Sequence, residues 1–325
     1  MSARDKNNKR EDTNFLRFVA IILIVNTHLK KFYPVAYFAT GGIIGNSIFF
    51  MLSSLGLSLS EKEKPATLLK YLEKRIVRIY PSVWLSLILL QLPLLIYAKK
   101  AANYDLLSFL GNFFYPPFWF LQAIMVYYFI GYFIMKRYSD RKFALAVLPL
   151  FLAYVFSYFK YTDLSRYSIG HLSSVVIFFY LGIFLFGIFL GSRNYKIRYG
   201  GARDLIWTAI LLILIYGNKY LMHRSMNFHA QFVEQLACFP LVYLLLKVSR
   251  SPLISRLMAL PVFSDAIAWT SACTLEIYIV HVAIRDRFGM SGCAFPFNIM
   301  IFVPLTLLLA SLIRQSALRI RMSLG

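Results

Sequence analysis

The first long apolar stretch of the chain, NFLRFVAIILIVNTHLKKF, carries Arg17 near one end and His28 near the other. If this stretch crosses a membrane, each ionisable side chain costs roughly 2.5–3.5 kcal/mol on insertion scales, so each needs a partner or a function. An imidazole with its ordinary pKa of about 6.5 can remove a proton from a hydroxyl or carry an acyl group. His28 is therefore the first candidate for a catalytic residue.

Arg17 and His28 share one helical face. They are separated by about three helical turns, or roughly 16 Å along the axis, and Asn14 lies on the same side. A polar stripe of this length does not suit contact with lipid. It predicts a helix face that lines the bundle interior or a water-filled path.

A second candidate site is the basic stretch EKRIVRIYPSVW, residues 73–84. Arg75 and Arg78 are three residues apart, and Lys74 is one turn before Arg78, so the three cations can meet one anion. Planar guanidinium groups suit phosphate recognition. The alternatives are charges that set membrane topology and contacts with lipid headgroups.

The composition identifies the class of protein. The chain has 325 residues, of which 59% are hydrophobic and 15% charged, and its mean hydropathy is +0.63. A soluble protein of this length could not bury so much apolar surface, so we expect a polytopic membrane protein. The net charge of +21 is assigned to loop residues that hold the topology, and not to nucleic-acid binding. The three cysteines have no metal-like spacing, so no metal site is expected.

The apolar segments predict an all-α transmembrane bundle of about ten spans. Lys and Arg are enriched in the two terminal tails and in alternate loops, which predicts that both termini are cytoplasmic. We expect a cytoplasmic tail over residues 1–13, a transmembrane domain over 14–313 and a second cytoplasmic tail over 314–325. The predicted spans are 15–34, 41–60, 79–98, 113–135, 143–159, 172–191, 204–217, 230–246, 262–284 and 295–313.

This topology brings polar residues of several spans to the outer level of the membrane, near His28. They are candidates for an outer pocket, although each could instead make a separate interhelical hydrogen bond or lie at the interface. Glu276 and His281 are about 140° apart on a helix, so we do not expect both to face one cavity directly. The candidates are Asn46, Trp119, Gln122, Glu276 and His281.

Five stretches in order resemble the motifs of the acyltransferase-3 family of integral-membrane acyltransferases. Two departures from the family pattern are Asn14, where an acidic residue is frequent, and Ser54, where glycine is usual. The stretches are LRFVAIILIVNTH (16–28), FFMLSS (49–54), KRIVRIYPSVW (74–84), FWFLQAIMVYY (118–128) and LEIYIVH (275–281).

The resemblance implies a bundle of ten or eleven helices that transfers acyl groups, usually acetyl, from cytoplasmic acyl-CoA to sugar hydroxyls at the outer face. It assigns His28 as the catalytic candidate, Arg75 and Arg78 as contacts of the CoA phosphates, and Arg17 as the first-span arginine. Acyl-CoA is then a donor substrate, and no permanently bound cofactor is expected.

We therefore expect a membrane-embedded O-acetyltransferase of an envelope or exported polysaccharide, in the inner (plasma) membrane of a bacterium. Its expected partners are acyl-CoA, a glycan or lipid-linked saccharide acceptor and membrane lipids. The rival hypothesis is a transporter that moves a glycan or small solute along the same polar path. A third is a catalytically inactive sensor or scaffold, against which the presence of His28 argues.

Overall fold

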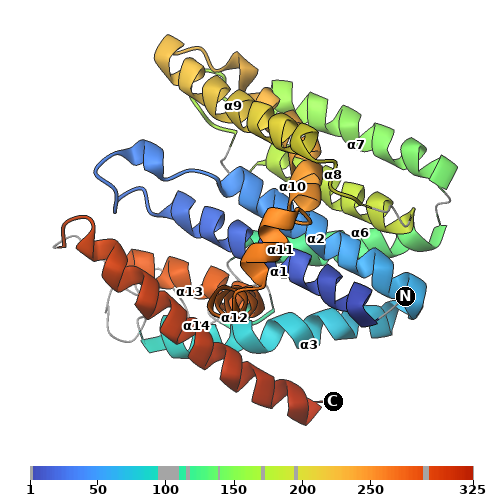
Figure 1. The fold of residues 1–325 in the computed structure, drawn as a ribbon, viewed down its shortest axis with the longest axis vertical. Helices are drawn as coiled ribbons and strands as arrows, with labels where there is room; N and C mark the ends of the chain where they lie inside the picture. Colours follow the sequence, from blue (N-terminus) through green and yellow to red (C-terminus); the bar gives the residue numbers. More distant parts are fainter. Residues whose placement is uncertain are drawn as a thin grey trace. The chain divides into compact units, whose positions relative to one another are not determined.

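The computed structural model describes residues 3–93, 110–114, 118–137, 140–169, 173–193, 197–287 and 293–324. In these ranges the regular structure is helical and no strand occurs, which confirms the all-α prediction (Figure 1). The main helices are α1 (Ala3–His28), α2 (Gly42–Glu63), α3 (Leu68–Ser86), α6 (Trp119–Arg137), α7 (Asp140–Tyr161), α8 (Ser174–Ser192), α9 (Ala202–Ser225), α10 (Phe232–Val248), α11 (Pro252–Met258), α12 (Pro261–Ala272), α13 (Thr274–Arg287) and α14 (Phe297–Leu324). Shorter elements are η1 (Ala36–Phe38), the π-helical η2 (Leu87–Gln91) and η4 (His229–Gln231).

The chain forms two compact units. Unit 1 contains Met1–Ala20, Ile43–Pro65 and Val126–Ala268, and unit 2 contains Ile21–Gly42, Ala66–Met125 and Trp269–Gly325. Thus α2 and α7–α11 belong to unit 1, and α3, α13 and α14 belong to unit 2. The remaining helices α1, α6 and α12 pass from one unit to the other.

The apolar helices identify an integral membrane protein. Among the described residues, six helices have the length and composition to cross a membrane: α2, α6, α8, α9, His229–Val248 and α14. α11 and α12, bent by 93° at their junction, count as a seventh if they form one broken span. Thr13–His28 and Val147–Tyr161 are shorter apolar helices that overlap the first and fifth predicted spans, and the first span was predicted too long, because the helix ends at His28 and not at residue 34. The number of ten spans and the cytoplasmic side of the termini stay predictions.

The predicted ninth span, 262–284, is not one continuous helix. It breaks between α12 and α13 at Cys273, whose N–H is shared between the carbonyl oxygens of Trp269 and Thr270. The carbonyl of Ala272 accepts a hydrogen bond from the Arg314 guanidinium. Because a distant side chain satisfies this carbonyl, the backbone can leave the helical hydrogen-bond ladder here.

The helices also extend beyond the predicted transmembrane domain. α1 begins at Ala3, within the segment expected to be a tail, and α14 continues to Leu324. Ile313 and Ala317 are buried one turn apart, so the apolar face of α14 continues past residue 313. The third predicted span, 79–98, is described only as far as residue 93, where α3 is followed by the π-helical η2.

In unit 1, α2 and α8 approach closely at small residues. A Cβ at Gly187 would overlap the Ser54 hydroxyl and the Met51 carbonyl oxygen, and a Cβ at Gly191 would lie 2.7 Å from Ser58 Cβ. Ser54 is fully buried at this contact. The serine fits because the facing residue, Gly187, has no side chain.

Replacing Gly187 with alanine should therefore destabilise unit 1. Overpacking of this kind costs about 1–3 kcal/mol, because backbone atoms of α2 would have to move. Thermal unfolding in detergent measures the effect. Gly56→Ala is the matched control. Gly56 also lies in unit 1, on α2, but no atom lies within 4 Å of the added Cβ, so this variant should not lower the unfolding temperature. Equal unfolding temperatures for the two variants would contradict the proposed packing.

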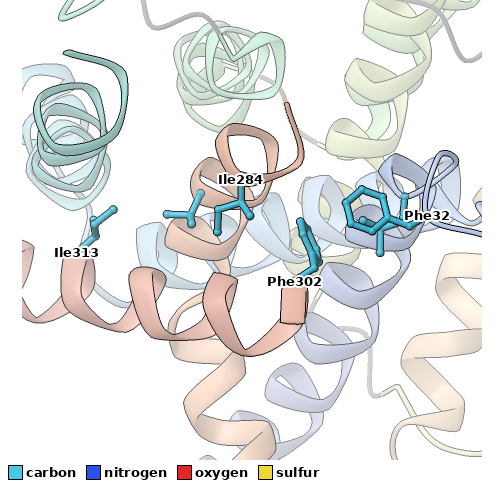
Figure 2. Packing of buried hydrophobic residues seen from close by; sticks show 6 residues of the cluster. Phe32, Ile284, Phe302 and Ile313 are labelled. Carbon is cyan, nitrogen blue, oxygen red and sulfur yellow. The ribbon is translucent and has the colours of Figure 1, made fainter. Parts of the chain in front are cut away.

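In unit 2, a buried apolar cluster packs α13 against α14 and the segment after α1 (Figure 2). The rings of Phe32 and Phe302 meet edge to face with centroids 5.2 Å apart. Leu29 and Val280 belong to the same cluster. Since Leu29 follows His28 and Val280 precedes His281, this packing brings the C-terminal end of α1, which carries His28, to the middle of α13, which carries His281.

Candidate active site

The two histidines of unit 2 are paired. His28 is the last residue of α1, His281 lies on α13, and His28 Nδ1 is 3.2 Å from His281 Nε2. Their ring centroids are 4.9 Å apart. His281 is fully buried, whereas His28 is partly buried. The structure thus joins the predicted catalytic residue to a second candidate that is 253 positions away in sequence.

If both rings are neutral, the hydrogen bonds of the pair assign their protons. His28 Nδ1 lies 2.9 Å from the Ile24 carbonyl oxygen, and His281 Nδ1 lies 3.1 Å from the Ile277 carbonyl oxygen. A carbonyl can only accept, so each Nδ1 carries the hydrogen and donates it. The single Nδ1–H of His28 is then shared between the Ile24 carbonyl oxygen and Nε2 of His281, which accepts. This leaves His28 Nε2 as the ring nitrogen with the lone pair, which is the form a general base needs.

The segment between α1 and α2 is tied to the end of α1 by Asn26. Its Nδ2 donates to the carbonyl oxygens of Phe38 (2.7 Å) and Thr40 (2.9 Å), and its Oδ1 accepts from the Tyr33 hydroxyl (2.5 Å). Gly41 follows with a φ of 102°, a conformation that favours glycine. This network holds the chain around the last turn of α1, where His28 lies.

Asn26→Ala should loosen this segment without unfolding the rest. It removes three hydrogen bonds and leaves two backbone carbonyls to find other donors, a loss of about 1–3 kcal/mol locally. Trypsin cleavage after the exposed Lys30 and Lys31 should become faster. Asn227→Ala, which alters an exposed asparagine of another loop, is the control. Unchanged cleavage in Asn26→Ala would show that the network does not hold the segment.

Aromatic side chains connect the histidine pair to the start of α6. The Tyr278 ring lies 5.7 Å from the His281 ring and 5.3 Å from the Phe120 ring, measured between centroids. Trp119 is next in this series, with its ring 6.1 Å from Phe120. Trp119 and Gln122, both predicted for the outer pocket, are partly buried in the first turn of α6.

Glu276 is engaged elsewhere in unit 2. Its Oε1 accepts a hydrogen bond from the Ser82 hydroxyl at 2.6 Å and lies 3.7 Å from Arg321 Nη2. Arg321 also donates to Ser82 at 3.0 Å. The structure therefore pairs Glu276 with α3 and α14, and His281 with α1. This division agrees with their different orientations on one helix, and the pocket role of Glu276 stays a prediction.

Several arginines gather where α3 packs against α14. Arg78 is exposed one turn before Ser82, and the positive charges of Arg78 and Arg314 both act on Arg321. Arg75 places its guanidinium 4.9 Å from the Tyr71 ring centroid, and its buried Nε has no hydrogen-bond partner. Positive charge is therefore in excess beside Glu276, which suits an anion.

Arg314 and Arg321 were missed by the sequence prediction, which placed them in a tail. The sequence did contain a signal for them. Arg314 and Arg321 are seven residues apart, and residues at this spacing lie on one face of a helix when the helix continues past residue 313.

Other predicted site residues lie on three different helices. Lys74 is exposed on α3. α1 is one uninterrupted helix, as the shared face of Arg17 and His28 requires. Asn46 lies on α2 in unit 1, and its Oδ1 is buried without a hydrogen-bond partner.

The fold and these residues define a class: a helical integral membrane protein with a paired histidine and a separate group of arginines. A comparison with models of protein families identifies the family within this class. The acyltransferase-3 model, described as an acyltransferase domain, matches residues 11–314, and the chain belongs to this family. Neither the comparison with curated proteins nor that with solved structures gives a match.

Proposed function

We propose that this membrane acyltransferase moves an acetyl group from cytoplasmic acetyl-CoA to a sugar hydroxyl of an envelope or exported polysaccharide at the outer face. The observation that carries the proposal is the His28–His281 pair, which leaves a basic nitrogen on His28 Nε2. In this proposal the chain has about ten spans in a bacterial inner membrane, with both termini cytoplasmic. Family membership favours a transferase over a transporter.

The donor site is proposed at the arginines. Arg75 and Arg78, with Lys74 nearby, would bind the phosphates of the 3′-phospho-ADP end of acetyl-CoA. Arg321 supports this assignment, because it donates a hydrogen bond to Ser82, which lies one helical turn after Arg78 on α3. Arg17 would lie on the path of the pantetheine arm, three turns before His28 on α1.

The reaction requires one proton transfer in each direction. His28 Nε2 removes the proton of the acceptor hydroxyl while the oxygen of this hydroxyl attacks the thioester carbonyl carbon. The C–S bond breaks, the new ester forms, and the protonated His28 returns the proton to the CoA thiolate. In the alternative, Nε2 first attacks the thioester carbonyl carbon, the C–S bond breaks and the CoA thiolate leaves. The acceptor hydroxyl then attacks the acetyl group, the bond from Nε2 to the acetyl carbon breaks, and the hydroxyl proton passes to the thiolate.

His281 acts in this scheme as a positioning residue. By accepting the Nδ1–H of His28, it holds the ring in the tautomer whose Nε2 is basic. Three further candidates of unit 2 are proposed to contact the acceptor: Trp119, Gln122 and Glu276. Trp119 would offer its ring face to the sugar.

Inverted membrane vesicles provide the test. Vesicles from expressing cells are incubated with acetyl-labelled acetyl-CoA, and label is measured in glycan inside the vesicles. Label that enters lumenal glycan only when the native protein is present supports the proposal. If no label is transferred while the purified protein is folded and the cells' own glycans are present, acyl transfer is excluded under these conditions and solute transport becomes the leading hypothesis.

A further inference from the structure

A second polar cluster, with two buried and three partly buried members, lies within unit 1 and is not used by the proposed reaction. Its residues come from the segment after α7, from the end of α9 and from the first turns of α10. On the predicted topology, the loops at this end of the helices lie at the outer face, where a saccharide would arrive. The members are Tyr167, Lys219, His223, Glu234 and Gln235.

Tyr167 and Glu234 form the centre of this cluster. The Tyr167 hydroxyl donates to Glu234 Oε2 at 2.6 Å, and Glu234 is 1% exposed. Burial first, and then the Glu234 carboxylate, raise the pKa of the Tyr167 hydroxyl, so that it stays protonated and donates. Lys219 Nζ lies 4.9 Å from the centroid of the Tyr167 ring, and the His223 ring lies 5.2 Å from it.

Gln231 holds the segment with Tyr167 in place. Its Oε1 accepts from the backbone N–H groups of Ser168 (2.8 Å) and Ile169 (2.9 Å). Its Nε2 donates to the carbonyl oxygens of Asp163 (3.3 Å) and Arg166 (2.9 Å). All four hydrogen-bonding positions of this buried amide are used, so the cluster is formed before any ligand binds.

Beside this satisfied amide, several buried polar atoms have no hydrogen-bond partner. They are Glu234 Oε1 and both Oε1 and Nε2 of Gln235, which is 1% exposed. Buried polar groups in folded proteins are nearly always paired, so unpaired ones indicate a missing partner. Gln231 lies four residues before Gln235, and every hydrogen-bonding position of its amide has a partner. The packing at this end of α10 can therefore supply partners to a buried amide, although the amide of Gln235 has none.

The same face of α10 contacts α2. The Cys238 thiol, one turn after Gln235, contacts the Ser47 hydroxyl. Asn46 precedes Ser47, and its Oδ1 is a further buried atom without a partner. Asn46 and Gln235 therefore lie at neighbouring levels of two helices in contact, and both present unpaired amide atoms.

The unpaired atoms specify the chemistry of a ligand. Three of them are acceptor oxygens, on Glu234, Gln235 and Asn46, and one is an amide nitrogen. A partner must supply several donors and at least one acceptor, as neighbouring hydroxyl groups do. The Glu234 carboxylate disfavours an anion, and the charge of Lys219, which acts on Glu234, disfavours a cation.

We infer that this cluster is a subsite for hydroxyl groups of a neutral saccharide, with Glu234 and Gln235 as its principal contacts. The inference rests on the proposed function, since the ligand that it names is of the same chemical class as the proposed acceptor. It concerns binding and can be measured without acyl transfer.

The test is equilibrium binding to purified protein in detergent. The probe is oligosaccharide released from the expressing cells' envelope by mild hydrolysis and labelled with a fluorophore at its reducing end. Fluorescence anisotropy should show at least tenfold weaker binding for Glu234→Gln and for Gln235→Leu. The controls Glu61→Gln, at a salt bridge to Lys136 in the same unit, and Gln315→Leu, at an exposed position of α14, should bind like the native protein.

Thermal unfolding separates a binding role from a structural one. Gln235→Leu removes an amide without partners, so its unfolding temperature should equal or exceed that of the native protein while saccharide binding is lost. Native-like binding by both variants overturns the inference, as does a native protein that does not bind the probe. A lower unfolding temperature for Gln235→Leu also overturns it, because the amide would then be structural.

The failures of the two proposals are distinguishable. A native protein that binds the oligosaccharide but transfers no acetyl group in vesicles refutes the proposed function and supports the subsite. A native protein that transfers acetyl groups, with both variants unchanged in their KM for the acceptor, overturns the subsite alone.

Discussion

Replacement of His28 by alanine is expected to reduce acetyl transfer by about 10²–10⁴-fold, the usual contribution of a general base or acid. The reason is that Nε2 of His28 is the basic nitrogen left by the hydrogen bonds of the histidine pair. The measurement is the initial rate of label transfer in inverted vesicles at matched protein abundance. His229→Ala, which removes an exposed histidine, should keep the native rate.

Two variants of His281 test its positioning role in the same assay. His281→Gln can still accept the Nδ1–H of His28, whereas His281→Leu cannot. We expect the glutamine variant to keep more activity, and the leucine variant to shift the pH profile of kcat because the protonation of His28 changes. A His28→Ala protein that transfers at the native rate would remove the catalytic assignment and turn attention to His281 and Glu276.

The second large effect is expected at the arginines. Arg78→Ala should raise the KM for acetyl-CoA by about 10- to 100-fold, since a hydrogen bond to a charged group contributes about 1.5–3 kcal/mol. Arg75→Ala combined with it should raise the KM further. The measurement compares acetyl-CoA with its analogue that lacks the 3′-phosphate. If Arg78 binds that phosphate, the native protein prefers acetyl-CoA and the variant loses the preference.

Arg319→Ala is the matched control for this series, because Arg319 is exposed on α14 between Arg314 and Arg321. Arg321→Gln extends the test to the arginine found through the structure. This variant also removes the positive partner of Glu276, so its unfolding temperature must be measured beside its KM. An unchanged KM in Arg78→Ala would place the CoA phosphates elsewhere.

The membrane class and the helical fold could be predicted from the sequence because hydropathy and spacing are local properties. Among the described residues, the six helices long and apolar enough to span a membrane each overlap one predicted span, although several of them end at other residues. The break at Cys273 could not be predicted in this way. It depends on Arg314, a residue about forty positions away that donates to the Ala272 carbonyl. The sequence prediction also missed the helical continuation of α14 past residue 313. The buried face of this part of α14 depends on contacts with other helices, which local hydropathy does not specify.

The sequence by itself determined which residue types could do chemistry: a histidine and an arginine on one helix face, and an arginine pair three residues apart. Only the tertiary structure decided their partners. His28 meets His281 across 253 positions, Arg321 meets Ser82 across 239, and Tyr167 meets Glu234 across 67. Helical periodicity specifies the direction of a side chain on its own helix, but the packing of distant helices specifies what that side chain contacts.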